Sequence, residues 1–134
     1  MQRYMTLLKE HNIKITPQRL AIIKLMDEQG HISVREIFER IKENFPSLSL
    51  ATVYKNINAM IENDFIKELK IVGLDNKYEL VKERHSHMIC QNCGEIEDVF
   101  TDISSLENSV PKESGFKVSE VSVQYFGTCK KCIV

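Results

Sequence analysis

The feature that most constrains this chain is the arrangement of its four cysteines in two C-x-x-C pairs. Cys90 and Cys93 form the first pair, and Cys129 and Cys132 form the second. Two pairs with this spacing are typical of a tetrahedral zinc site with four thiolate ligands. Four thiolates leave no open position on the ion, so we expect a structural Zn²⁺. The alternative is a pair of redox dithiols, but neither pair is placed at a helix that follows a strand.

Length, charge and the first residues limit the class of protein. The chain has 134 residues, of which 43% are hydrophobic, so it can form one domain or two small ones. No apolar run is long enough to span a membrane, and the first residues lack an apolar signal segment, so we expect a cytoplasmic protein. Disulfides are disfavoured there, which again favours metal binding by the cysteines. The net charge of −1 does not indicate a nucleic-acid partner by itself.

Capping signals predict three successive helices in the first half of the chain. Thr16 followed by Pro17 is typical of a helix start, and Gly30 is typical of its end. Ser33 can cap the next helix, and Ser49 can cap a third that runs to about residue 63. Apolar residues recur at helical spacing after each of these caps. A short helix is also expected before residue 12.

A hairpin is predicted after these helices. Residues 65–69 and 77–80 read as strands joined through a turn at residues 73–76. Three helices and a hairpin make a winged helix-turn-helix, with the hairpin as the wing. A charged connector follows, so we place the first domain at residues 1–81 and the second at residues 82–134.

The helix after Ser49 has a polar face opposite its apolar stripe. The residues assigned to that polar face, which carries almost no acidic residues until Glu62, are Thr52, Tyr54, Lys55, Asn56 and Asn58. Such a face can enter the major groove of DNA, where amide and lysine groups reach base edges and hydroxyls reach phosphates. On this helix alone, an ordinary solvated face is an equally good interpretation.

The second half of the chain predicts a small domain that needs a staple. Strands flank Cys90 and Cys93, a short helix ends near residue 109, and another strand is expected from Phe116 to Phe126. About 50 residues form only a small core, and zinc would join the first strand turn to the C-terminal segment. Alternating apolar residues in the last strand suggest pairing with a second subunit.

A second metal is indicated by an H-x-H motif next to the first cysteine pair. His85 and His87 occupy alternate positions, so on a strand they point to the same face. Asp98 follows the cysteine knuckle and can return to the same place. Because the four-thiolate site is already full, these residues predict a separate ion.

The sequence resembles the ferric uptake regulator (Fur) superfamily of metal-dependent bacterial repressors along its whole length. The matching segments are Thr16-Pro17-Gln18-Arg19, Ser49-Leu50-Ala51-Thr52-Val53-Tyr54, His85-Ser86-His87, Cys90-x-x-Cys93-Gly94, Asp98 and Gly127-x-Cys129-x-x-Cys132. The resemblance implies the α+β class, with an N-terminal winged helix-turn-helix and a C-terminal zinc-stapled α/β dimerisation domain. It also implies a homodimer.

The resemblance further implies a regulatory metal site. The positions that match the family's ligands are His31, Glu79, His85, His87 and Asp98. Three imidazoles and two carboxylates suit Fe²⁺, Mn²⁺ or Zn²⁺, and the carboxylates favour iron and manganese. Because the ligands come from both predicted domains, one ion would close the domains onto each other and favour the DNA-binding form.

The implied partner is double-stranded DNA with a pseudo-palindromic operator, bound by two recognition helices of the dimer. Tyr54, Lys55 and Asn56 are expected to face the groove, with Thr52 near phosphate. Arg19 is expected to contact the DNA backbone.

Within the family, two branches remain open. The segment Tyr54-Lys55-Asn56 and the compact C-terminus favour a peroxide-stress repressor, whereas Glu79 favours an iron-responsive repressor, because peroxide sensors usually have aspartate there. Two alternatives lie outside the family. A zinc hydrolase would need an open coordination position and a general base, for which no motif is present, and a zinc-stapled protein-interaction module would need no DNA.

Overall fold

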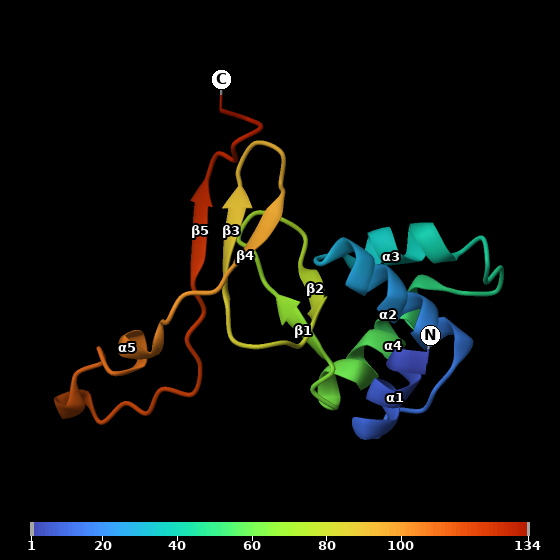
Figure 1. The fold of residues 1–134 in the computed structure, drawn as a ribbon, viewed down its shortest axis with the longest axis horizontal. Coiled ribbons are helices and arrows are strands. Elements are labelled where there is room, and N and C mark those ends of the chain that lie inside the picture. Colours follow the sequence, from blue (N-terminus) through green and yellow to red (C-terminus); the bar gives the residue numbers. More distant parts are fainter. Residues whose placement is uncertain (1, 134) are drawn as a thin grey trace. The chain divides into compact units, whose positions relative to one another are not determined.

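The computed structural model describes residues 2–133, and the chain divides into two compact units, residues 1–82 and 83–134. The division falls next to the boundary predicted after residue 81. The first unit is mainly helical, and the second is built around a small sheet (Figure 1). The predicted α+β class is therefore confirmed. None of the described helices has the length and apolar character that a membrane span requires.

The first unit contains four helices and one hairpin. Its elements are α1 (Gln2–Glu10), α2 (Pro17–Gln29), α3 (Val34–Ile41), α4 (Leu50–Glu62), β1 (Ile66–Leu69) and β2 (Lys77–Leu80). The strands β1 and β2 are antiparallel, with Ile66 opposite Leu80. This arrangement is the winged helix-turn-helix that the sequence predicts.

The three predicted helix caps are all present. The side-chain oxygen of Thr16 accepts a hydrogen bond from the backbone N–H of Arg19 at 3.2 Å, before α2. Ser33 and Ser49 accept equivalent bonds at the starts of α3 and α4, at 3.2 and 3.1 Å. Each cap satisfies a backbone N–H that has no partner within its helix. Gly30 ends α2 with φ at 80°, a conformation that favours glycine.

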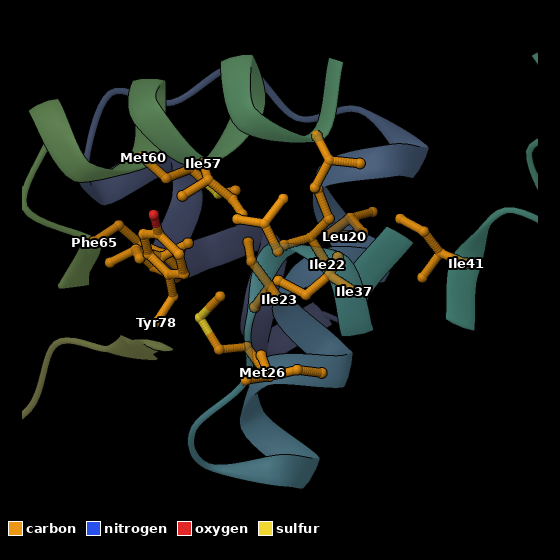
Figure 2. Close-up of a cluster of buried hydrophobic side chains, with 14 of the residues drawn as sticks. Leu20, Ile22, Ile23, Met26, Ile37, Ile41, Ile57, Met60, Phe65 and Tyr78 are labelled. Carbon is orange, nitrogen blue, oxygen red and sulfur yellow. The ribbon is translucent and has the colours of Figure 1, made fainter. Parts of the chain in front are cut away.

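The helices of the first unit pack around one apolar core. Ile22, Ile23 and Met26 of α2 are fully buried, as are Ile57 and Met60 of α4. Figure 2 shows these side chains in a single cluster with residues from α3 and the hairpin. Burying a side chain of this size contributes roughly 1.5–3 kcal/mol. Helix α4 and the wing therefore pack against the same core.

The wing is joined to the α2–α3 connection by an isolated bridge. Ile32 and Tyr78 exchange both backbone hydrogen bonds, at 3.1 and 2.8 Å. Ile32 is fully buried and Tyr78 is nearly so. Because the bridge is antiparallel, it places His31, which precedes Ile32, beside Glu79, which follows Tyr78.

The second unit contains a three-stranded sheet and short helical turns. Its elements are β3 (Ser86–Cys90), β4 (Ile96–Val99), α5 (Ser104–Glu107), the 3-10 turn η1 (Lys112–Ser114) and β5 (Gln124–Gly127). The strand order is β4-β3-β5, with β4 antiparallel and β5 parallel to β3. Figure 1 shows the three strands side by side.

The predicted last strand is too long. The expected strand from Phe116 to Phe126 is wrong for residues 116–123, which form no ladder, and β5 begins at Gln124. Alternating apolar residues do not make a strand unless a neighbouring strand shares their backbone hydrogen bonds, and within residues 116–127 the ladder with β3 covers Gln124–Gly127. Phe116 is 71% exposed.

Candidate metal centres and recognition surface

The four cysteines meet at one end of the β4-β3-β5 sheet. Cys90 ends β3, and the turn to β4 carries Cys93. The parallel pairing of β5 with β3 sets Gly127 opposite Cys90, so the segment after β5 brings Cys129 and Cys132 to the same place. The four sulfur atoms lie within 4.8 Å of one another.

The spacing of the sulfurs fits a tetrahedral metal site. The Cys93 and Cys129 sulfurs are 3.7 Å apart, and all four cysteines are free thiols. Zinc–sulfur bonds of about 2.3 Å in a tetrahedron place the sulfurs about 3.8 Å apart. A disulfide would require about 2.05 Å. The residues therefore fit the predicted zinc rather than a redox dithiol.

Hydrogen bonds and burial act in opposite directions on two of the thiols. The backbone N–H groups of Cys129 and Cys93 donate to the Cys90 sulfur at 3.3 and 3.5 Å, and they lower the pKa of the Cys90 thiol to about 6. Burial, followed by thiol contacts, raises the pKa of Cys129 to about 12. Four gathered sulfurs cannot all ionise at neutral pH without a nearby positive charge, which a bound cation supplies.

The first unit holds two of the predicted regulatory ligands together. The Nε2 atom of His31 lies 2.7 Å from the Oε2 atom of Glu79. The two side chains are only 8% and 2% exposed. Glu79 on β2 is thus a buried carboxylate, which is costly unless a hydrogen-bond donor or a cation meets it. An imidazole and a carboxylate in this arrangement can serve as an ion pair or as two ligands of one ion.

The second unit holds the other three predicted ligands together. His87 on β3 pairs with Asp98 on β4, and His85 precedes β3. The Nε2 atoms of His85 and His87 lie 3.4 and 3.6 Å from the Oδ1 atom of Asp98. These distances exceed a good N–H···O bond of up to about 3.2 Å. They are within the range of about 3.0–3.6 Å that separates neighbouring ligands of one ion when the bonds are about 2.1 Å long.

The tautomer of His85 also suits a metal ligand. Its Nδ1 atom lies 2.9 Å from the backbone oxygen of Glu83. A carbonyl oxygen only accepts, so Nδ1–H must be the donor, and the neutral ring keeps its lone pair on Nε2. Metal-binding histidines commonly have such a carbonyl partner. The Nε2 atom is the one that faces Asp98.

Helix α4 exposes part of the predicted DNA-contacting set. Tyr54 is 44% exposed, Lys55 is exposed, and Thr52 is half-buried next to its cap, with its hydroxyl 2.9 Å from that of Ser49. A shallow hollow along this face is lined by Ala51, Tyr54, Lys55, Asn58, Ala59 and Glu62. The surface combines hydroxyl, amide and ammonium groups, which are the donors used on DNA.

The assignment of Asn56 to this exposed face is wrong. Asn56 is only 9% exposed, and its side-chain oxygen accepts a hydrogen bond from the Nε atom of Arg19 at 3.0 Å. With Val53, Ile57 and Met60, it occupies the buried stripe at positions i, i+3, i+4 and i+7. That spacing was readable in the sequence, but the polar type of the residue concealed it.

Comparison with known proteins identifies the family. The model of the Ferric uptake regulator family matches residues 10–126. The peroxide operon regulator of Bacillus subtilis is 35% identical over 127 residues, covering 93% of this chain and 88% of that protein.

Two solved structures share the fold. The Campylobacter jejuni peroxide stress regulator is 36% identical, with a TM-score of 0.71 over 96% of this chain and 98% of that one. The Helicobacter pylori ferric uptake regulator is 30% identical, with a TM-score of 0.73 over 98% and 89%. These matches exclude the hydrolase alternative, because the family's members are not enzymes. The chain belongs to the ferric uptake regulator family of metal-dependent transcriptional repressors.

Proposed function

We propose that this chain is a homodimeric, peroxide-responsive repressor that binds a pseudo-palindromic operator in double-stranded DNA when its regulatory metal is bound. The main support for the proposal is that each unit gathers side chains that can bind a metal ion. His31 and Glu79 gather in the winged-helix unit, and His85, His87 and Asp98 gather in the sheet unit. Because it acts on chromosomal DNA, the protein would work in the cytoplasm.

The regulatory ion in this proposal is a single Fe²⁺ or Mn²⁺ that takes ligands from both groups. The donor chemistry supports this, since carboxylates and imidazoles together suit these ions. A ligand set divided between two units couples metal binding to their arrangement. The arrangement of the two units that brings all five ligands together binds the ion more tightly than other arrangements do, so the ion favours it. That arrangement would be the one that binds DNA.

The structural ion is a Zn²⁺ held by Cys90, Cys93, Cys129 and Cys132. Its role would be to hold the second unit together, so that this unit can pair with a second copy. The exposed apolar side chains of that unit support pairing, since they include Phe116, Tyr125 and Phe126. Zinc at this site would stay bound while the regulatory metal exchanges.

Tyr54 and Lys55 would face the major groove, and Thr52 and Arg19 would contact the backbone. The exposed face of α4 supports the first pair. A dimer would present two such helices to two half-sites.

Peroxide sensing is supported by the names of relatives such as the Bacillus subtilis peroxide operon regulator and the Campylobacter jejuni peroxide stress regulator. Bound Fe²⁺ would supply the electron that cleaves peroxide. His31 and His85 would then be the nearest oxidisable side chains, and their oxidation would weaken metal and DNA binding. Glu79 is the feature that favours the second candidate, an iron-responsive repressor, because aspartate is usual at this position in the resembling peroxide sensors.

The experiment has two stages. Duplexes selected by the Mn²⁺-loaded protein from a random-sequence pool are first used in a mobility-shift assay with and without metal. The Fe²⁺ and Mn²⁺ forms then receive brief, low-dose peroxide and are analysed by peptide mass spectrometry. A single added oxygen on a peptide with His31 or His85, in the Fe²⁺ form only, is expected together with DNA release. Unmodified histidines and intact DNA binding would instead assign the protein to the iron-responsive branch.

A further inference from the structure

Asn56 is a polar residue on the buried side of the recognition helix. It lies between Val53 and Ile57 in the stripe of α4 that faces the core, and it is 9% exposed. A buried amide is costly unless its polar atoms find partners. Its oxygen finds one outside α4, the Nε–H of Arg19 in the first turn of α2, at 3.0 Å. This bond links residues 37 positions apart in the sequence.

Arg19 is fixed at three points by this arrangement. Its backbone N–H donates to the Thr16 cap at 3.2 Å. Its Nη1 donates to the backbone oxygen of Lys14 at 3.0 Å, and its Nε donates to Asn56. The guanidinium is therefore held by the segment before α2 on one side and by α4 on the other. A free arginine side chain would have to lose most of its rotamer freedom to reach the same position.

Both acceptors of the Arg19 guanidinium are neutral. An amide oxygen and a backbone carbonyl orient the group without cancelling its charge, whereas a carboxylate in the same place would cancel it. A guanidinium has five N–H groups, and these two bonds use only part of them. The remaining N–H groups can form charge-assisted bonds to a phosphate.

We propose that Asn56 is a positioning residue, which holds the Arg19 guanidinium ready for a DNA phosphate and ties that contact to the recognition helix. The inference rests on the proposed DNA-binding function and extends it to a residue that does not itself reach DNA. Because Asn56 belongs to α4, a phosphate bound by Arg19 would fix the register of α4 in the groove. The rival interpretation is that Asn56 and Arg19 only stabilise the fold.

A double-mutant cycle tests whether Asn56 affects DNA binding through Arg19 or independently of it. Wild type, Asn56→Ala, Arg19→Ala and the double variant are loaded with zinc and Mn²⁺. Their affinities are measured for the selected duplex and for an unrelated duplex. Asn56→Ala should weaken binding to both duplexes by about three- to tenfold, the range expected when one arginine must be ordered on binding. In the Arg19→Ala background, the same change should have an effect below about twofold.

Asn58→Ala is the matched control, because Asn58 lies two residues further on the exposed face of α4. It removes an amide of the same size without touching Arg19. Any effect of Asn58→Ala should be equal in the wild-type and Arg19→Ala backgrounds.

Asn56→Asp provides a readout that a purely structural role would not change. The carboxylate keeps an acceptor for Arg19 Nε but cancels its charge. The slope of log affinity against log salt should therefore flatten by about one unit, as it should for Arg19→Ala. Asn56→Ala should keep the wild-type slope, because the arginine charge is retained. Melting curves and zinc content identify the variants that are folded.

Two outcomes would overturn the inference. One is equal loss of affinity from Asn56→Ala with and without Arg19, and the other is wild-type binding by a folded Asn56→Ala protein. If Asn56→Ala does not fold, the test is the slope of log affinity against log salt for Asn56→Asp. A slope equal to that of wild type counts against the inference. If the wild type binds no DNA at all, the proposed function itself fails, which is a separate result.

Discussion

The two units of this protein achieve order in different ways. Among its described residues, the first unit buries a cluster of 17 hydrophobic side chains, contributed by all four helices, by their connections and by the hairpin. Among the described residues of the second unit, the buried hydrophobic side chains are Ile89, Cys90 and Ile103. A core that small does not offset the conformational entropy lost on folding of about 50 residues.

The difference shows where each unit's stability originates. The first unit is stabilised by apolar burial and by capped helices. In the proposed function, the second unit is stabilised by zinc among its cysteines and by a second copy that covers exposed apolar residues such as Phe116, which is 71% exposed. Removing metal and removing core volume should therefore damage different units.

The largest effect should follow from removing one zinc ligand. In Cys93→Ser, the second unit should lose its zinc, its fold and its ability to dimerise, because structural zinc sites contribute about 10–16 kcal/mol of apparent binding free energy. The helical signal of the first unit should remain. Zinc analysis, circular dichroism melting and sedimentation measure the three properties. A Cys93→Ser protein that is dimeric and melts normally would show that the second unit does not depend on zinc for its stability.

A core truncation in α4 should have the opposite pattern. Met60 is fully buried, and Met60→Ala should destabilise the first unit by about 2–5 kcal/mol through lost burial and a cavity. Denaturant unfolding followed by helical circular dichroism reports the loss, while zinc content should stay unchanged. Val72→Ala is the control, because Val72 is 90% exposed and its truncation should be nearly neutral. Equal losses from the two variants would show that the core assignment is wrong.

A smaller effect is expected from the ion pair that links the wing to α3. The Nζ atom of Lys77 lies 2.8 Å from the Oε1 atom of Glu36. Burial opposes ionisation of Glu36, but the bonds from Lys77 and Ser33 outweigh it, and the pKa of Glu36 lies below its ordinary value of 4.5. The ion pair therefore stabilises the fold fully above pH 4.5, and this stabilisation is lost as pH falls through the lower pKa that Glu36 has in the folded state.

Because the pair is partly solvated, Lys77→Ala should cost less than about 1 kcal/mol at neutral pH. The difference from wild type should shrink in acid, as measured by denaturant unfolding at several pH values. Lys24→Ala, which removes a charge from the exposed face of α2, should show no such trend. A difference between wild type and Lys77→Ala that stays constant down to strongly acidic pH would remove the ion pair from the account.

Local signals predicted the first unit well. The caps Thr16, Ser33 and Ser49 depend on residues within one turn, and all three are observed. The polar type of Asn56 predicts an exposed side chain, whereas its helical spacing from Val53 and Met60 places it on the buried stripe of α4. Its actual partner, Arg19, lies 37 residues away, and no local pattern indicates that bond.

Long-range pairing was harder to predict in both units. Alternating apolar residues predict a strand from Phe116, but strand formation there depends on pairing with β3, and within residues 116–127 that ladder covers Gln124–Gly127. The His31–Glu79 pair follows from the bridge between Ile32 and Tyr78, which has no sequence signature. The resemblance to the family indicated these two ligand positions, and the bridge supplies the physical reason for their proximity.

In the proposed function, DNA binding depends on metal ligands supplied by both units. The most direct test is the affinity of the zinc-loaded protein for the selected duplex as Mn²⁺ is added. Wild-type affinity should rise by about 5- to 150-fold, the usual range for coupled sites. Glu79→Ala in the first unit and Asp98→Ala in the second should each lose most of that rise while retaining zinc. Affinity that ignores Mn²⁺, or that still rises fully in either variant, would contradict the account.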